Sequence, residues 1–97
     1  MKEFYIYILA NQKRVTLYIG VTSDVIKRIY QHKTNAVKSF TKKYSVHRLV
    51  HYEIYDTFDV AVQREKNLKK WKREWKIKLI EENNPNWKDL YTSIIAP

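Results

Sequence analysis

Apolar residues dominate two short stretches near the start of the chain, and this pattern predicts two strands. Residues 4–10 form a near-continuous apolar run rich in Tyr and Ile, and residues 15–21 form a second, β-branched run. A polar turn at residues 11–14 separates the two runs. Because this connection is short, we expect the two strands to pair in antiparallel orientation.

Alternation along these strands assigns their side chains to opposite faces. One face of the first strand is expected to carry Tyr5, Tyr7 and Leu9. In the second strand, Tyr18 and Gly20 fall on the face opposite the apolar set Leu17, Ile19 and Val21. In each strand, one face therefore carries a tyrosine, Tyr7 in the first strand and Tyr18 in the second.

Helical periodicity and one further apolar run account for the rest of the chain. Capping residues at 22–24 precede the first helix, and an acidic start at 56–59 precedes the second. The predicted elements are a helix at 25–33, a third strand at 46–55, a helix at 60–72, a helical stretch at 75–82 and a tail around Trp87 that packs back on the body. The order strand-strand-helix-strand-helix-helix indicates an α+β domain, an α/β sandwich.

The composition narrows the class of protein. A chain of 97 residues fits one domain spanning residues 1–97, and the absence of cysteine excludes disulfides and thiolate metal sites. No apolar run approaches the length of a membrane span, and the first residues do not resemble a signal peptide. We therefore expect a cytoplasmic protein that works without a membrane.

The net charge of the chain indicates the kind of partner that it binds. The net charge is +9, from 19 Lys and Arg against 10 Asp and Glu, which favours a polyanion such as nucleic acid. Basic residues alternate with aromatic ones such as Trp71 and Trp75, a pattern that suits phosphate contact and base stacking; the alternative is a solvated helix face above a core. The basic residues expected to contact nucleic acid are Lys33, Lys42, Lys43, Lys66, Lys69, Lys70 and Arg73.

The only glycine of the chain, Gly20, stands inside the second apolar run. Glycine weakens a strand unless something must approach its backbone closely. We interpret Gly20 as a place where a phosphate approaches the backbone. The alternative is a bulge that leads into the following helix.

Arg28 and His32 stand four residues apart in the first predicted helix and therefore on one face. They fall beside Val25, at the edge of the apolar stripe, where the helix meets the sheet. This position suits site residues. Arg28 could instead extend over apolar surface, and His32 could be a packing residue.

One carboxylate falls on a face that should be buried. Glu65 follows Ala61 at helical spacing and precedes Leu68, and Trp75 and Leu79 extend the same pattern if the helix continues. An unpaired carboxylate is costly there, so Glu65 should bind a metal, face a cleft, or pair with Arg28 or a nearby lysine. A single carboxylate with waters and a substrate phosphate suits Mg²⁺, with Mn²⁺ as the substitute.

Taken in order, these residues resemble the GIY-YIG nuclease superfamily, in particular its small single-domain, excinuclease-like bacterial members. The resemblance covers nearly the whole chain. It rests on the segments Tyr5-Ile6-Tyr7, Tyr18-Ile19-Gly20-Val21-Thr22-Ser23-Asp24, Arg64-Glu65-Lys66-Asn67-Leu68-Lys69-Lys70-Trp71 and Asn84-Pro85-Asn86-Trp87-Lys88-Asp89-Leu90-Tyr91. The first triplet departs from the family by beginning with Tyr5 instead of glycine.

The resemblance implies a three-stranded antiparallel sheet flanked by helices, and it gives roles to particular residues. By it, Tyr7 and Tyr18 match the two motif tyrosines, while Arg28, His32 and Glu65 match the catalytic arginine, the helix histidine and the metal-binding glutamate. Asn84 matches a supporting asparagine less closely. Many family nucleases carry an extra DNA-binding domain, which this chain does not show.

We therefore expect a Mg²⁺-dependent endonuclease that cleaves nucleic acid, DNA in preference to RNA, by structure more than by sequence, without an organic cofactor. Glu65 would hold the ion, Arg28 would bind the phosphate, and Tyr7 or Tyr18 would accept a proton from the attacking water. His32 would position the tyrosine or relay its proton. The alternatives are a non-catalytic nucleic-acid-binding module on the same fold and an interaction protein that uses the Trp71 and Trp75 face.

Overall fold

The architecture was determined from a computed structural model that describes residues 2–11, 16–34 and 46–95. Within these residues, the elements are β1 (Phe4–Ala10), β2 (Leu17–Thr22), α1 (Val25–Lys33), β3 (Arg48–Tyr55), α3 (Phe58–Lys70), α4 (Arg73–Asn83) and α5 (Tyr91–Ile95). The sheet has three strands in the order β2-β1-β3, and both pairs are antiparallel. The α+β class, the sheet and the predicted order of elements are confirmed.

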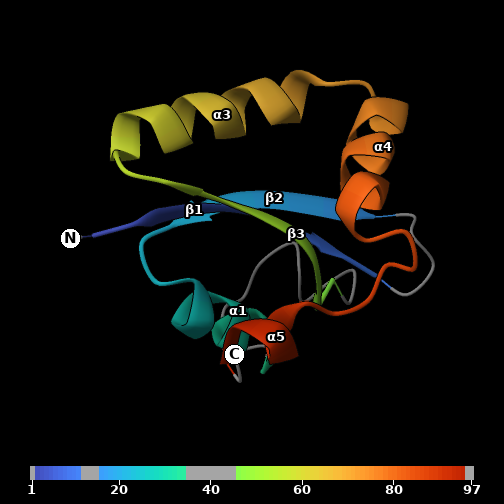
Figure 1. The fold of residues 1–97 in the computed structure, drawn as a ribbon, viewed down its shortest axis with the longest axis horizontal. Helices are drawn as coiled ribbons and strands as arrows, with labels where there is room; N and C mark the ends of the chain where they lie inside the picture. Colours follow the sequence, from blue (N-terminus) through green and yellow to red (C-terminus); the bar gives the residue numbers. More distant parts are fainter. Residues whose placement is uncertain (1, 12–15, 35–45, 96–97) are drawn as a thin grey trace.

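The helices cover the sheet from two sides (Figure 1). Helix α3 runs along one face, with α4 beyond its end, while α1 and the short α5 lie under the other face. Strand β1 occupies the middle of the sheet and is buried on both sides from Ile6 to Ala10.

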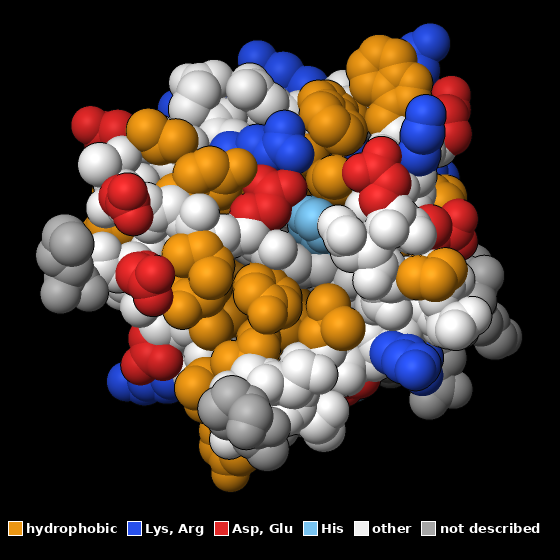
Figure 2. Space-filling view, in the orientation of Figure 1, with side chains coloured by type: hydrophobic (Ala, Val, Ile, Leu, Met, Phe, Trp, Pro, Cys, Tyr) orange, Lys and Arg blue, Asp and Glu red, His pale blue; other side chains and the backbone are white. Residues whose placement is uncertain are grey.

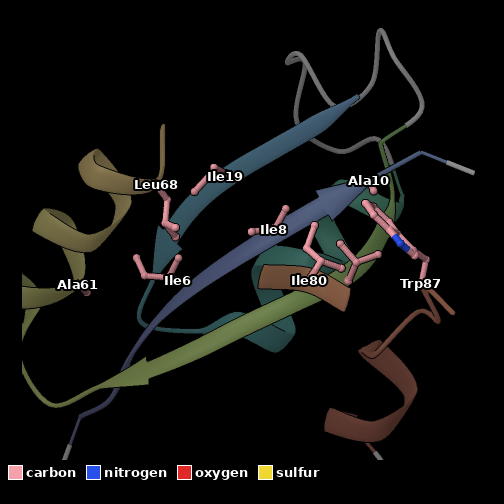
Figure 3. Close-up of a cluster of buried hydrophobic side chains, with 9 residues drawn as sticks. Ile6, Ile8, Ala10, Ile19, Ala61, Leu68, Ile80 and Trp87 are labelled. Carbon is pink, nitrogen blue, oxygen red and sulfur yellow. The ribbon is translucent and has the colours of Figure 1, made fainter. Parts of the chain in front are cut away.

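Alternate residues of β1 enter two separate cores, as the sequence predicts. One core joins Ile6 and Ile8 to Ile19 of β2 and to Leu68 of α3, all of which point into the space beneath the helices (Figure 3). The other core joins Tyr7 and Leu9 to side chains of α1 and to Leu49. The tyrosine-bearing faces of β1 and β2 therefore lie on the α1 side.

Most boundaries lie within two residues of their predicted positions. Strand β1 and helix α1 match their predictions, whereas α3 begins earlier than residue 60 because Thr57 caps it, accepting a hydrogen bond from the amide of Val60 at 3.4 Å. Helix α5 was predicted only as a packed tail.

The helical pattern does not continue from α3 into α4. Trp71 and Lys72 adopt extended backbone angles between the two helices. The side chain of Trp75 is 51% exposed, so the continued buried pattern considered for it is absent and it is not part of the core. No helix in the described part of the chain is both long and apolar enough to cross a bilayer.

Candidate active site

The candidate site lies on the sheet face that α1 covers. Helix α1 begins directly after β2, and Asp24 caps it by accepting a hydrogen bond from the amide of Lys27 at 3.1 Å. Val25 and Ile29 then pack against the sheet. This short connection fixes the helix above β1 and β2, so that its Arg28 and His32 reach the strand tyrosines.

Four residues that the sequence singles out meet in one cluster. The hydroxyl of Tyr7 lies 3.3 Å from Nε2 of His32, and Nε of Arg28 donates to that hydroxyl at 3.4 Å. The ring of Tyr18 lies 5.4 Å from the ring of His32 and 6.3 Å from that of Tyr7. We call Tyr7, Tyr18, Arg28 and His32 the tyrosine cluster.

Gly20 makes room for this cluster. It pairs directly with Tyr7 across the strands, and a Cβ built on Gly20 would lie 2.4 Å from both Cζ and the hydroxyl of Tyr7. The close approach expected at Gly20 is present, but the approaching group is the phenol ring of Tyr7. This corrects the expectation of a bare floor for phosphate. The register between β1 and β2 has no shift at Gly20, so the bulge is excluded.

Burial governs the protonation of the two innermost groups. Tyr7 and His32 are each only 1% exposed. Desolvation raises the pKa of Tyr7 to about 12, against the opposing hydrogen bond from Arg28. Desolvation, with the charge of Arg28 and that of His47, lowers the pKa of His32 to about 4. At neutral pH both groups are therefore uncharged, and Arg28 carries the charge of the cluster.

Arg28 is tied to the phenols from the edge of the cluster. Its hydrogen bond to Tyr7 raises the pKa of Arg28, and its interaction with Tyr18 acts in the same direction. Nη1 also donates to Gln31 at 3.4 Å. Arg28 is half-buried, so its guanidinium lies between the phenols and solvent.

Glu65 approaches the cluster from the other side of the sheet. It lies between the fully buried Ala61 and Leu68 on α3, and its side chain is 17% exposed. Its charge contributes to raising the pKa of Tyr7, which places it within electrostatic reach of the cluster. Its ion-pair partner is Lys69, at 3.6 Å, and not Arg28.

Glu65 could offer a metal ion a single carboxylate. Among the described residues, no group of three His, Asp or Glu side chains could enclose a metal ion. One partly buried carboxylate is what Mg²⁺ uses when waters and a substrate phosphate complete its octahedral shell. The residues present therefore fit this ion and do not fit a closed structural site.

A second polar network, which the sequence analysis missed, joins β3 to α3. Glu53 accepts hydrogen bonds from Arg64 Nε at 2.8 Å, from Arg64 Nη2 at 3.0 Å and from the hydroxyl of Tyr55 at 2.7 Å, and it lies 2.8 Å from Nε2 of His51. Burial opposes the charge of Glu53, but these partners outweigh it and hold the pKa of Glu53 well below its usual range. We call these residues the Glu53 network. It anchors the residue that precedes Glu65.

Asn84 is placed in the fold and not in the cluster. Its side chain is buried and donates to the carbonyls of Val50 and Lys88 at 3.1 and 2.9 Å, while its oxygen accepts from the amide of Lys88 at 2.9 Å. These bonds hold the end of α4 beside β3. The amide of Asn84 is used by the backbone, and a role for it toward the site stays a prediction.

The basic residues predicted to contact nucleic acid differ in their surroundings. Lys33 is bonded to Asp89 and donates to the carbonyl of His47 at 2.9 Å, so these contacts serve the fold, and its contact with nucleic acid stays a prediction. Lys42 and Lys43 lie outside the described residues. The other four of these predicted residues are exposed and lie in α3 or at the start of α4: Lys66, Lys69, Lys70 and Arg73.

The chain matches known proteins along most of its length. A family model described as the GIY-YIG catalytic domain matches residues 3–78. A UPF0213 protein of Staphylococcus saprophyticus is 38% identical over 82 residues, covering 84% of this chain and 99% of that one. A UPF0213 protein of Haloquadratum walsbyi is 36% identical over 78 residues, covering 80% and 86%.

A solved structure has the same fold. The solution NMR structure of a UPF0213 protein from Bacillus halodurans superposes with a TM-score of 0.57 at 24% identity, covering 93% of this chain and 95% of that one. At this identity the likeness supports the fold alone.

Proposed function

Since this chain belongs to the GIY-YIG nuclease family, we propose that it is a Mg²⁺-dependent endonuclease that hydrolyses phosphodiester bonds in DNA, selected by structure and not by sequence. The observation that supports this most is the joining of Tyr7, Arg28 and His32 by hydrogen bonds, with Tyr18 beside them. These groups come from two strands and a helix, and a carboxylate of another helix lies within electrostatic reach.

Exposure separates the roles of the two tyrosines. Tyr7 is almost fully buried, whereas Tyr18 is half-buried and lines a surface groove of about 290 Å³ together with Lys69 and Lys76. Tyr18 is therefore the phenol that contacts and orients the attacking water. Tyr7 acts through Arg28, because its hydroxyl accepts from Arg28 and can donate to neutral His32.

Arg28 supplies the charge that the reaction needs. Its guanidinium is always protonated, and its planar set of donors matches phosphate oxygens. Because Tyr7 fixes Nε, the group is oriented before the substrate arrives, and no reorganisation is needed as negative charge develops on the phosphate. Glu65 is the residue that would hold Mg²⁺, and the ion would supply further positive charge to the same phosphate.

A cleavage panel tests this proposal. The purified chain is mixed with Mg²⁺ or Mn²⁺ and with labelled single-stranded, duplex and branched DNA, and with RNA. Arg28→Ala should lower the cleavage rate about 10²- to 10³-fold, as the removal of an electrostatic stabiliser does, and Glu65→Gln should abolish metal-dependent cleavage.

Exposed neighbours on the same helices provide the controls. Lys27→Ala and Asp59→Asn remove charge from α1 and α3 at exposed positions, and both should cleave like the parent. The proposal is wrong if no substrate is cut, or if Arg28→Ala and Glu65→Gln cut normally. Salt-dependent binding without cleavage would indicate the non-catalytic binding module instead.

A further inference from the structure

The corner between α3 and α4 exposes an aromatic side chain that the fold does not use. Two extended residues, Trp71 and Lys72, turn the chain there and bring the rings of Trp71 and Trp75 to 6.2 Å in an edge-to-face arrangement. Trp71 packs against the core and carries the guanidinium of Arg64 over its ring at 5.1 Å. Trp75, in contrast, remains 51% exposed, with Nζ of Lys72 over its ring at 5.6 Å.

Two grooves are lined by residues of this corner. One, of about 390 Å³, is lined by Trp71, Trp75, Lys78, Leu79 and Glu82. The other is the groove lined by Tyr18, Lys69 and Lys76. Both grooves involve α4, through Trp75 in the first and the neighbouring Lys76 in the second, and the second also includes Tyr18 of the tyrosine cluster.

The corner is also strongly cationic. Residues 66–78 contain seven Lys or Arg and one Glu. Burial and the charge of Arg73 lower the pKa of Lys76, so the surroundings disfavour its positive charge. An anion beside Lys76 would offset the repulsion from Arg73. Figure 2 shows hydrophobic side chains standing out at this corner, at the upper right, with Lys and Arg side chains beside them.

We propose that the α3–α4 corner binds an unpaired nucleobase on Trp75 and the phosphates of its strand along Lys69 and Lys76, and so leads a single strand toward Tyr18. This inference rests on the proposed function, because it assigns a substrate feature to the same surface. A protein partner would suit the exposed ring, but the density of positive charge favours a polyanion. A base can stack on an exposed aromatic ring only when it is not already stacked in a duplex, so the base must be unpaired.

Binding without metal tests this site separately from cleavage. A labelled single-stranded DNA oligonucleotide is titrated with the parent and with variants at several salt concentrations, and anisotropy is recorded. Trp75→Ala should weaken binding about 5- to 150-fold, because one stacked base contributes roughly 1–3 kcal/mol. The salt dependence should not change, since no phosphate contact is removed. Trp75→Phe should retain most of the affinity.

Two controls sharpen the result. Phe58→Ala removes an aromatic side chain of similar exposure, 53%, from the opposite end of α3 and should not change the affinity. An oligonucleotide of the same length with abasic sites offers phosphates without bases, and the parent should bind it as weakly as Trp75→Ala does.

The outcomes separate this proposal from the nuclease. Normal binding by Trp75→Ala, or full affinity for the abasic strand, overturns the stacking site even if the parent cleaves DNA. Base-dependent binding without any cleavage supports the stacking site and counts against the nuclease. Absence of all binding overturns the stacking site, while the nuclease is still decided by the cleavage panel. Loss of self-association in Trp75→Ala with unchanged DNA affinity would show a protein contact and overturn the site.

Discussion

The Glu53 network and the tyrosine cluster are both polar, partly to fully buried groups attached to the sheet, but they are bonded differently. Around Glu53, the contacts with Tyr55, His51 and Arg64 span 2.7 to 3.0 Å. In the tyrosine cluster, the contacts of Tyr7 with His32 and Arg28 are 3.3 and 3.4 Å. The first distances are those of strong charge-assisted bonds, and the second are at the long end of the usual range.

The difference separates a structural role from a chemical one. Glu53 keeps its charge because its partners match it, so the network is complete and joins α3 to β3. In the cluster, burial acts against charge on both Tyr7 and His32, and only Arg28 remains ionised. A site of this kind is prepared for negative charge that arrives with a substrate, and catalytic hydrogen bonds often tighten only at that stage.

Gly20→Ala should break the cluster and leave the Glu53 network intact. The new Cβ would lie 2.4 Å from the ring and the hydroxyl of Tyr7, so the ring must shift and its contacts with His32 and Arg28 must change. We expect a loss of about 1–3 kcal/mol in the free energy of unfolding, as for other overpacked sites. Cleavage should fall about 10²-fold, since small displacements of positioned groups have such effects.

A double-mutant cycle with Tyr7→Ala checks the cause. Once the ring is removed, Gly20→Ala should cost almost nothing further in thermal or urea unfolding. Equal costs in both backgrounds would show that the clash with Tyr7 is not the reason.

Removing one hydroxyl from each group sharpens the comparison. Tyr7→Phe and Tyr55→Phe each delete a hydrogen-bonding hydroxyl while keeping the ring, so each should lose about 1 kcal/mol of stability. Only Tyr7→Phe should lower cleavage, by about tenfold or more, because only Tyr7 holds Arg28. Rates measured at a temperature well below both unfolding midpoints decide this, and a comparable loss in Tyr55→Phe would contradict the separation.

The two groups should also respond to acid in different pH windows. The pKa of His32 is lowered from 6.5 to about 4, so the unfolded chain takes up a proton first and stability falls between about pH 6.5 and 4. The pKa of Glu53 is held below its ordinary 4.5, so its contribution is present above that pH and is lost below it.

Urea unfolding across pH measures both contributions. His32→Gln should flatten the upper window and Glu53→Gln the lower one, each by at most ~1.4 kcal/mol per pH unit. Identical pH profiles for the two variants would show that the groups are not independent.

The fold was predictable from local patterns because those patterns were unambiguous. The apolar run at Phe4–Ala10 and the capped, amphipathic stretch at Val25–Lys33 gave strand and helix boundaries that the structure confirms. The predicted cluster of Tyr7, Tyr18, Arg28 and His32 also followed from strand alternation and helical spacing. Both inferences use periodicity over a few residues, which the sequence records directly.

What the sequence did not reveal depends on contacts between distant segments. The Glu53 network joins residues 11 apart in sequence, on different elements, and nothing in the pattern of β3 distinguishes Glu53 from an exposed strand residue. Asn84 and Lys33 have residue types typical of a site, yet their partners Val50 and Asp89 are assigned only by tertiary packing. The break between the two helices was predicted, but the exposure of Trp75 depends on the angle that two extended residues set between them, which periodicity does not record.

The central position of β1 restricts how this chain can change its length. Odd and even residues of Phe4–Ala10 supply opposite cores, so inserting or deleting one residue would turn Tyr7 toward the aliphatic side and an isoleucine toward Arg28 and His32. The two sets of side chains cannot be exchanged. The described side chains of the first core are hydrophobic, whereas His32 and Arg28 on the α1 side bond to the hydroxyl of Tyr7. The number of residues in this strand is therefore fixed by the chemistry on one side of it.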